Sequence, residues 1–287
     1  MSIHNSLVLV SDSEAEAAVE TAFLLAEQAQ GHVTGVHVTG DSVLNMPPII
    51  EGMTERQIMR EFEGMRDRLS GLEGDAQRLF DEVASRHSAA RVNEAAPGQG
   101  VTASWLVLAG RADRVLSERA RVFDLLISGV AGTTAGESTL SVLEHAVFDA
   151  GRPVLVVPRT IPKSIGSTIM IGWNRAANAA RAVMAAMPML KSAKRVVIGY
   201  VDTGAKSGPS AEDLASSLSW HGITAEVRTI SAGGAPVSDL LMSEAADIGA
   251  DLVVMGAYSH SRMREFVLGG VTRQALRRVV TPIMLMH

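Results

Sequence analysis

The sequence predicts an α/β protein with two tandem copies of one unit, each a doubly wound five-stranded parallel sheet. Three observations lead to this prediction. Short apolar runs alternate with segments of helical period, which is typical of parallel strands covered by helices on both faces. The chain has 287 residues, more than one average domain needs. Sequence patterns also recur between its two halves.

The clearest recurrence marks the last two strands of each copy. The segment Asp124–Gly129 (DLLISG) corresponds to Asp251–Gly256 (DLVVMG). Each is followed by a proline-led apolar strand, Pro153–Val157 and Pro282–Met286. Both copies also begin with an apolar strand and an alanine-rich helical stretch, so the chain is interpreted as a duplication.

In the second copy, short apolar runs again alternate with segments of helical period, and this alternation predicts its strands and helices. We expect strands near residues 168–173, 195–201, 223–230, 251–256 and 282–286, and helices near 175–190, 210–220, 236–249 and 270–280. Pro236 suits a first helical turn, and Ser210 with Asp213 resembles an N-cap followed by an acidic residue. Right-handed crossovers between these strands give an open, doubly wound sheet.

Two prolines and a glycine between the copies indicate a connecting segment. The predicted division is a first domain over 1–157, a linker over 158–166 and a second domain over 167–287.

The first copy carries an insertion that the second lacks. Thr54 and Gln57 offer a capping box, and apolar residues at steps of three and four predict a long amphipathic helix over 54–86. The stripe consists of Ile58, Phe62, Met65, Leu69, Leu72, Ala76, Leu79 and Val83. This stripe either covers its own domain or forms an interface with a partner or a second chain.

Composition excludes several functions. A net charge of −5 argues against a nucleic-acid-binding protein, because phosphate neutralisation needs a basic surface. The absence of cysteine excludes disulfides, thiol nucleophiles and cysteine metal sites. The apolar run near the N-terminus is too short for a signal peptide, and no run approaches the roughly 18 residues of a membrane span. We therefore expect a cytoplasmic protein without a membrane partner.

The loop after the strand at 251–256 is the best candidate for an anion site. Parallel sheets bind ligands at the carboxyl ends of their strands, and helix N-termini present unpaired N–H groups to anions. Gly256, Gly269 and Gly270 would let the backbone approach a phosphate, and Thr272 can donate a hydroxyl.

These residues resemble the phosphate loop of universal stress proteins, G-x2-G-x9-G-S/T. The matching positions are Gly256, Ser259, Gly269 and Gly270, continued by Val271 and Thr272. Serine stands at the second glycine position, and glycine replaces the hydroxyl residue after the third. The resemblance covers nearly the whole chain and is to the tandem form, with two Rossmann-like domains of the adenine nucleotide alpha hydrolase kind.

The resemblance implies that the second copy binds an adenine nucleotide, namely ATP with Mg²⁺. Asn174 matches a strand-end aspartate that holds the adenosine, and Val201 matches a position whose backbone meets the adenine. In the first copy Asp12, Gly129 and Gly132 match the family pattern, but the rest of the loop does not. The first site is therefore expected to be degenerate.

Two functions remain open. The chain is either a nucleotide-binding protein with a role in stress response, or a nucleotide-independent interaction protein with degenerate pockets. No catalytic residues and no metal site are predicted, and ATP hydrolysis would be slow because no base is placed to activate water. The family resemblance implies that the two copies pair within one chain, related by a pseudo-two-fold axis, and a homodimer of chains is a further expectation.

Overall fold

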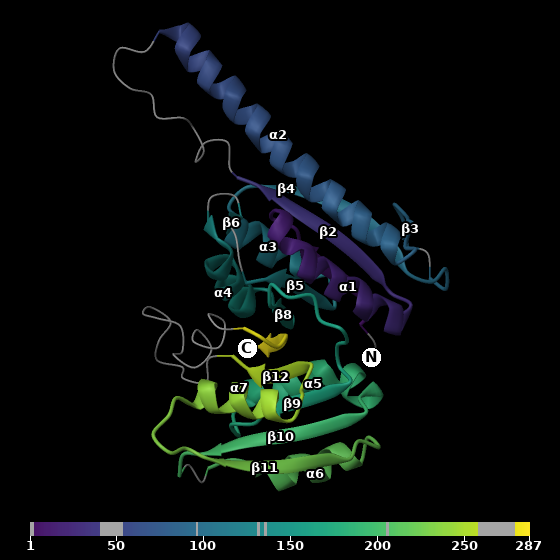
Figure 1. Ribbon diagram of the computed structural model, residues 1–287, viewed down its shortest axis with the longest axis vertical. Coiled ribbons are helices and arrows are strands. Elements are labelled where there is room, and N and C mark those ends of the chain that lie inside the picture. Colours follow the sequence, from purple (N-terminus) through teal and green to yellow (C-terminus); the bar gives the residue numbers. More distant parts are fainter. Residues whose placement is uncertain are drawn as a thin grey trace.

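The computed structural model describes residues 3–40, 54–95, 97–130, 133–134, 137–204, 207–257 and 279–287 (Figure 1). Its strands are β1 (Asn5–Leu9), β2 (His32–Thr39), β3 (Ala90–Arg91), β4 (Thr102–Ala109), β5 (Leu125–Gly129), β6 (Thr133–Thr134), β7 (Glu137–Ser138), β8 (Val154–Val157), β9 (Thr168–Gly172), β10 (Arg195–Asp202), β11 (Ala225–Ser231), β12 (Leu252–Gly256) and β13 (Ile283–Met286). Its helices are η1 (Ser13–Ala15), α1 (Glu16–Ala29), α2 (Glu55–Arg86), α3 (Ala112–Ala120), α4 (Thr139–Asp149), α5 (Ala177–Ser192), α6 (Ala211–Ser219) and α7 (Val237–Asp247).

Within the described ranges, an 11-stranded sheet runs in the order β11-β10-β9-β12-β13-β8-β5-β1-β2-β4-β3. Each copy contributes five parallel strands in the same relative order, and β3 adds a short strand beyond β4 in the first copy. The α/β class and the duplication are therefore confirmed. The fourth helix expected in the second copy, near 270–280, falls almost wholly outside the described residues.

The two predicted sheets are joined into one. Strands β8 and β13 pair antiparallel, with Leu155 opposite Met284, which is the register that two copies related by a two-fold axis would adopt. Each would otherwise be an edge strand with unpaired N–H and C=O groups. Their pairing satisfies those groups and makes the sheet continuous through the middle of the molecule.

The repeated aspartates fasten corresponding strands in each copy. The Oδ2 atom of Asp124 accepts hydrogen bonds from the N–H groups of His4 and Asn5, both at 3.0 Å. The carboxylate of Asp251 accepts from Ser167 at 3.1 Å and Thr168 at 2.9 Å. In each copy, the repeated aspartate thus links the start of the first strand to the segment that leads into the fourth strand.

Each face of the sheet carries one apolar core that includes both copies. Helices α1, α5, α6 and the second half of α2 cover one face, and α3, α4 and α7 cover the other. The first core extends from Phe23 in α1 to Met284 in β13, and the second from Leu116 in α3 to Leu241 in α7. No helix in the described part of the chain is long and apolar enough to cross a membrane.

Helix α2 covers its own domain along only part of its length. From Ala76 onward it packs on the sheet, and Phe80 lies between the rings of Phe23 and Trp105, with centroids 5.6 and 5.5 Å away. Gly35 leaves room for this ring, because a Cβ there would stand 2.6 Å from Phe80 Cδ2. The first half projects beyond the rest of the molecule (Figure 1). The capping box of Thr54 and Gln57 is confirmed, with the Thr54 N–H donating to Gln57 Oε1 at 2.9 Å.

Candidate functional site

The predicted site of the second copy lies at the carboxyl ends of three neighbouring strands. Asn174 follows β9, Val201 lies near the end of β10, and Gly256 ends β12. In the sheet, β9 stands between β10 and β12, so the chain winds away from it in two directions. This is the switch point at which open parallel sheets bind ligands.

The other predicted residues of this site are Ser259, Gly269, Gly270, Val271 and Thr272, and they lie outside the described residues. The phosphate-binding role assigned to them stays a prediction.

Gly256 is enclosed by a neighbouring helix. A Cβ at this position would stand 2.4 Å from the backbone N of Ala179 and 2.7 Å from the carbonyl C of Asn178, both in the first turn of α5. Real Cβ atoms do not come so close to backbone atoms. The missing side chain therefore allows β12 and α5 to pack closely, a reason for the glycine that the sequence motif does not reveal.

Asn174 forms a turn at the end of β9. Its side chain is exposed, and its Oδ1 accepts a hydrogen bond from the N–H of Ala176 at 3.1 Å. In the first copy, Asp12 Oδ1 accepts in the same way from the N–H of Glu14, at 2.8 Å. The predicted correspondence between Asp12 and Asn174 is thus matched by their local geometry.

The main chain of Val201 is the part of this residue that lies at the site. Its side chain is 6% exposed and belongs to the core that includes Leu241. Register with β9 stops at Gly199, whereas β10 continues beside β11 as far as Asp202. Residues 200–202 therefore extend past β9 at the switch point, and their peptide groups border the expected ligand position.

Arg175 is a residue that sequence reasoning missed. Its φ of 65° lies in the left-handed region, and its guanidinium stands 4.8 Å from the centroid of the Tyr200 ring. Gly208 makes room for this turn, because a Cβ there would stand 2.9 Å from the Arg175 carbonyl oxygen. A positive charge is thereby held at the ends of β9 and β10.

The segment that enters α6 packs beside the same strand ends. Trp173 Nε1 donates a hydrogen bond to the Pro209 carbonyl at 3.0 Å. The predicted cap is confirmed, since the Ser210 N–H donates to Asp213 Oδ2 at 2.8 Å and the Asp213 N–H donates to Ser210 Oγ at 3.1 Å. Hydrogen bonds from the backbone and hydroxyl of Ser210 lower the pKa of Asp213, with a smaller contribution from the charge of Arg175.

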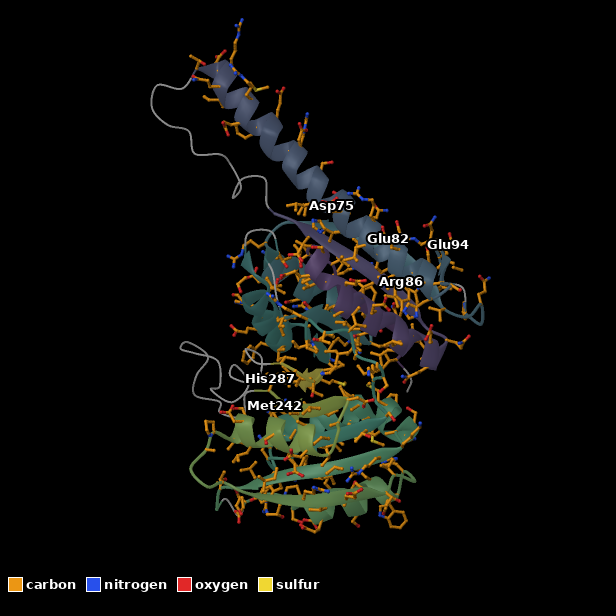
Figure 2. All side chains as sticks on the ribbon, in the orientation of Figure 1. Asp75, Glu82, Arg86, Glu94, Met242 and His287 are labelled. Carbon is orange, nitrogen blue, oxygen red and sulfur yellow. The ribbon has the colours of Figure 1, made fainter. Side chains whose placement is uncertain are left out.

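Asn178 is a second residue that the sequence did not single out. It is buried at 6% exposure in the first turn of α5, and its amide donates to the carbonyl oxygen of Ala257, the residue after β12. His287 Nδ1 donates to the same oxygen at 3.2 Å, and its ring meets Phe148 of α4 edge-on, with centroids 4.7 Å apart. Both hydrogen bonds to Ala257 therefore come from the second copy, and the contact with Phe148 of the first copy places His287 near the junction of the two (Figure 2).

The first copy provides fewer of the expected groups. Asp12 caps η1, and Gly129 ends β5, where the atom nearest to an added Cβ would be Glu14 O at 4.0 Å. Gly132 lies outside the described residues. Glu14 is also paired with Arg159, at 3.4 Å.

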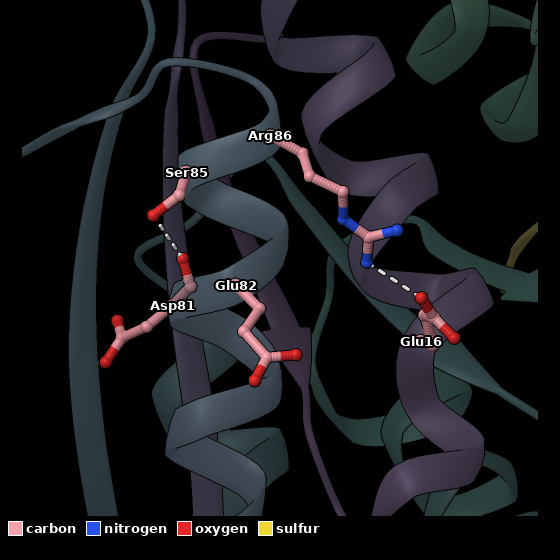
Figure 3. Close-up of a pocket in the computed structure, with 5 residues that line it drawn as sticks. All are labelled: Glu16, Asp81, Glu82, Ser85 and Arg86. Carbon is pink, nitrogen blue, oxygen red and sulfur yellow. Dashed lines mark hydrogen bonds and ion pairs between the residues drawn. The ribbon is translucent and has the colours of Figure 1, made fainter.

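An open surface depression lies elsewhere, between α1 and α2 (Figure 3). Its lining residues are Glu16, Asp81, Glu82, Ser85 and Arg86. Arg86 donates to Glu16 at 2.7 Å and pairs with Glu20 at 2.9 Å, so its charge is already engaged. Across the described ranges, no group of three or more His, Asp or Glu side chains could hold a metal ion.

Comparison with known proteins adds a family and a fold. The universal stress protein family matches residues 174–287. A universal stress protein from Archaeoglobus fulgidus DSM 4304 has a similar structure, with a TM-score of 0.65, 14% identity, and coverage of 98% of this chain and 97% of that chain. A protein of unknown function from Pseudomonas aeruginosa PAO1 gives a TM-score of 0.54, 14% identity, and coverage of 99% and 92%.

A search of curated proteins finds no match. At these identities the two structural likenesses concern the fold alone, and they extend over both copies. The family match covers the second copy, including Asn174, Val201 and Gly256. The chain therefore contains a universal stress protein domain at residues 174–287.

Proposed function

We propose that the second copy binds an adenine nucleotide, ATP with Mg²⁺, and that its occupancy serves as a signal in a cytoplasmic stress response. One observation carries this proposal. The three family-matched positions that the structure describes, Asn174, Val201 and Gly256, stand at one edge of the sheet on three adjacent strands. Ligands of open α/β sheets bind at this kind of edge.

The described residues fit the adenosine part of such a ligand. The peptide groups of residues 200–202 offer donors and acceptors to a base, and the Asn174 amide is exposed at the end of β9. Arg175 adds a positive charge that favours a polyanion. The phosphates would rest on the loop containing Gly269 and Gly270.

Calorimetric titration with ATP and Mg²⁺ tests the proposal. We expect one nucleotide per chain and tighter binding of ATP than of GTP. Replacement Gly269→Trp should abolish the heat because the indole fills the phosphate loop. The same replacement at Gly129, in the first copy, should leave binding in place. Absence of heat from the unaltered chain would overturn the proposal, and circular dichroism of each variant separates lost binding from lost folding.

A second candidate is an interaction protein that needs no nucleotide. The projecting half of α2 favours it, as do the two departures from the phosphate motif, Ser259 and Gly270. An unaltered chain that gives no heat with ATP, yet assembles through α2, would support this function.

A further inference from the structure

The first half of α2 carries a regular apolar stripe that the described residues cover only in part: Ile58 and Phe62 are half-buried and Leu72 is exposed. The stripe residues recur at alternating steps of four and three from 58 to 83, which is the a/d pattern of a coiled coil. Ala76 and Val83 are fully buried against the domain, whereas Leu72 is 50% exposed and Met59, the residue after Ile58, is 59% exposed. From Ala76 onward the domain buries this stripe, whereas before Ala76 the described stripe residues keep part of their surface exposed.

We propose that residues 55–72 of α2 pair with the same residues of a second copy as an antiparallel two-helix coiled coil. This inference depends on α2 alone and not on nucleotide binding.

Packing of the second half of α2 determines the direction. Phe80 and Val83 already pack on α1 and the sheet along the a/d side of the helix. In a parallel pair, the partner's helix would run on along that same side and occupy the space of α1. In an antiparallel pair, the partner's helix passes the projecting half and then leaves beyond Glu55, so the two bodies lie at opposite ends.

The buried second half also fixes the register. Coiled coils place an a residue of one helix opposite a d residue of the other. Glu55 opposite Leu72 of the partner ends the overlap before Ala76, which the domain covers completely. A shift by one heptad would place Ile58 of the partner opposite Ala76 and collide with the domain. The permitted overlap has a length of roughly 27 Å at 1.5 Å per residue.

Charges beside the seam are complementary in this register. Arg56 and Glu63 occupy b positions, and Glu73 and Arg66 occupy the e positions that face them on the partner. The pairs Arg56–Glu73 and Glu63–Arg66 each occur twice by symmetry, and all four are of opposite sign. Arg56, Glu63 and Arg66 are exposed in the single chain. Exposed pairs contribute little affinity, but like charges here would oppose this register.

Sedimentation over a range of concentrations tests association. The intact chain should change from monomer to dimer as concentration rises, because a short seam gives moderate affinity. The double replacement Phe62→Ser and Leu72→Ser should leave a monomer. Met184→Ser serves as the control, because it also removes an apolar side chain, 64% exposed, but on α5. A monomer at every concentration overturns the proposal, whether α2 is then covered by its own chain or by a different protein.

Disulfide formation tests direction and register, because the chain has no cysteine of its own. A mixture of Glu55→Cys chains with Leu72→Cys chains should form crosslinked dimers on mild oxidation. Leu72→Cys alone should not crosslink, since the two positions 72 lie at opposite ends of an antiparallel pair. Crosslinking of Leu72→Cys alone would indicate a parallel pair and overturn the antiparallel arrangement. Failure of the mixture to crosslink would overturn the register.

Discussion

Gly256 and Gly129 end corresponding strands of the two copies in different surroundings. Around Gly256 the backbone of α5 stands 2.4 Å from the position of an added Cβ, whereas around Gly129 the nearest atom is 4.0 Å away. Neither residue requires a positive φ. The cost of a methyl group at each position therefore depends on space alone.

We expect Gly256→Ala to lower the free energy of unfolding by about 1–3 kcal/mol, the usual cost of overpacking, because α5 must move away from β12. Gly129→Ala should change it by less than about 0.5 kcal/mol. Urea unfolding of the two variants measures the difference. Equal effects would show that the helix accommodates the methyl group, and that close packing is not the reason for the glycine.

At this scale the sequence revealed part of the candidate site. Gly256 was found because it belongs to a motif with fixed spacing, and Asn174 was found because it matches the strand-end aspartate of the family. Arg175 and Asn178 were missed because a left-handed φ and a hydrogen bond to a residue 79 positions away have no local signature. Gly208 was the available signal for Arg175, since a glycine often marks a close approach of another segment.

At the level of single elements, the end of α2 is tied to α1 through a histidine. His87 Nε2 lies 2.7 Å from Glu20 Oε2, and Nδ1 lies 2.7 Å from Glu27 Oε1. The ring stacks on Phe23 at 5.5 Å. Burial acts most strongly and lowers the pKa of His87, but the hydrogen bonds and charges of the two glutamates together outweigh it, so the pKa is raised.

This contact makes stability depend on pH. A raised pKa in the folded state adds stability that is fully present below the unfolded value of about 6.5 and is lost as pH rises through the folded value. We expect the free energy of unfolding to fall across that window, and His87→Gln to remove this fall. Urea unfolding at several pH values measures it. His221→Gln, at an exposed histidine, should keep the wild-type profile. A fall that persists in His87→Gln would assign it to other groups.

Helix α2 shows which part of an element its sequence can predict. The capping box and the spacing of apolar residues predicted both its existence and its bounds, since both are local. They left open what the stripe contacts, because the same spacing of apolar residues suits packing on the helix's own sheet and packing on another helix. The domain buries the stripe only from Ala76 onward, because the first half of α2 projects beyond the rest of the molecule. That boundary depends on tertiary structure and has no local signal in the sequence.

For the molecule as a whole, each apolar core includes residues of both copies, so we expect the two copies to unfold as one cooperative unit. Met284 of β13 is fully buried within a core that reaches α1 of the other copy. We expect Met284→Ala to cost about 2–5 kcal/mol and to lower the stability of both copies together, in one transition. Met184→Ala, at a residue 64% exposed on α5, should cost less than about 0.5 kcal/mol.

Denaturant unfolding followed by tryptophan fluorescence and by circular dichroism checks this. Trp105 reports on the first copy, and Trp173 and Trp220 report on the second. Two separate transitions, with only one shifted by Met284→Ala, would contradict a single unit.

The duplication and the succession of strands and helices along the chain could be predicted because each copy repeats local patterns, including the aspartate ahead of the fourth strand and the proline ahead of the fifth. The joining of the two sheets was not predicted, because the sequences of β8 and β13 indicate a buried strand without indicating which strand lies beside it. Their composition offered a hint: VLVV and IMLM carry no polar or charged residue of the kind that protects a free edge.

Strand pairing between β8 and β13 is intramolecular, so dilution cannot separate the two copies. Their mutual concentration is set by the tether at 158–166 and does not change with the amount of protein in the cell. An assembly that responds to abundance must therefore form on another surface. Pairing of the two copies is thus independent of protein concentration, whereas association with other molecules can depend on it.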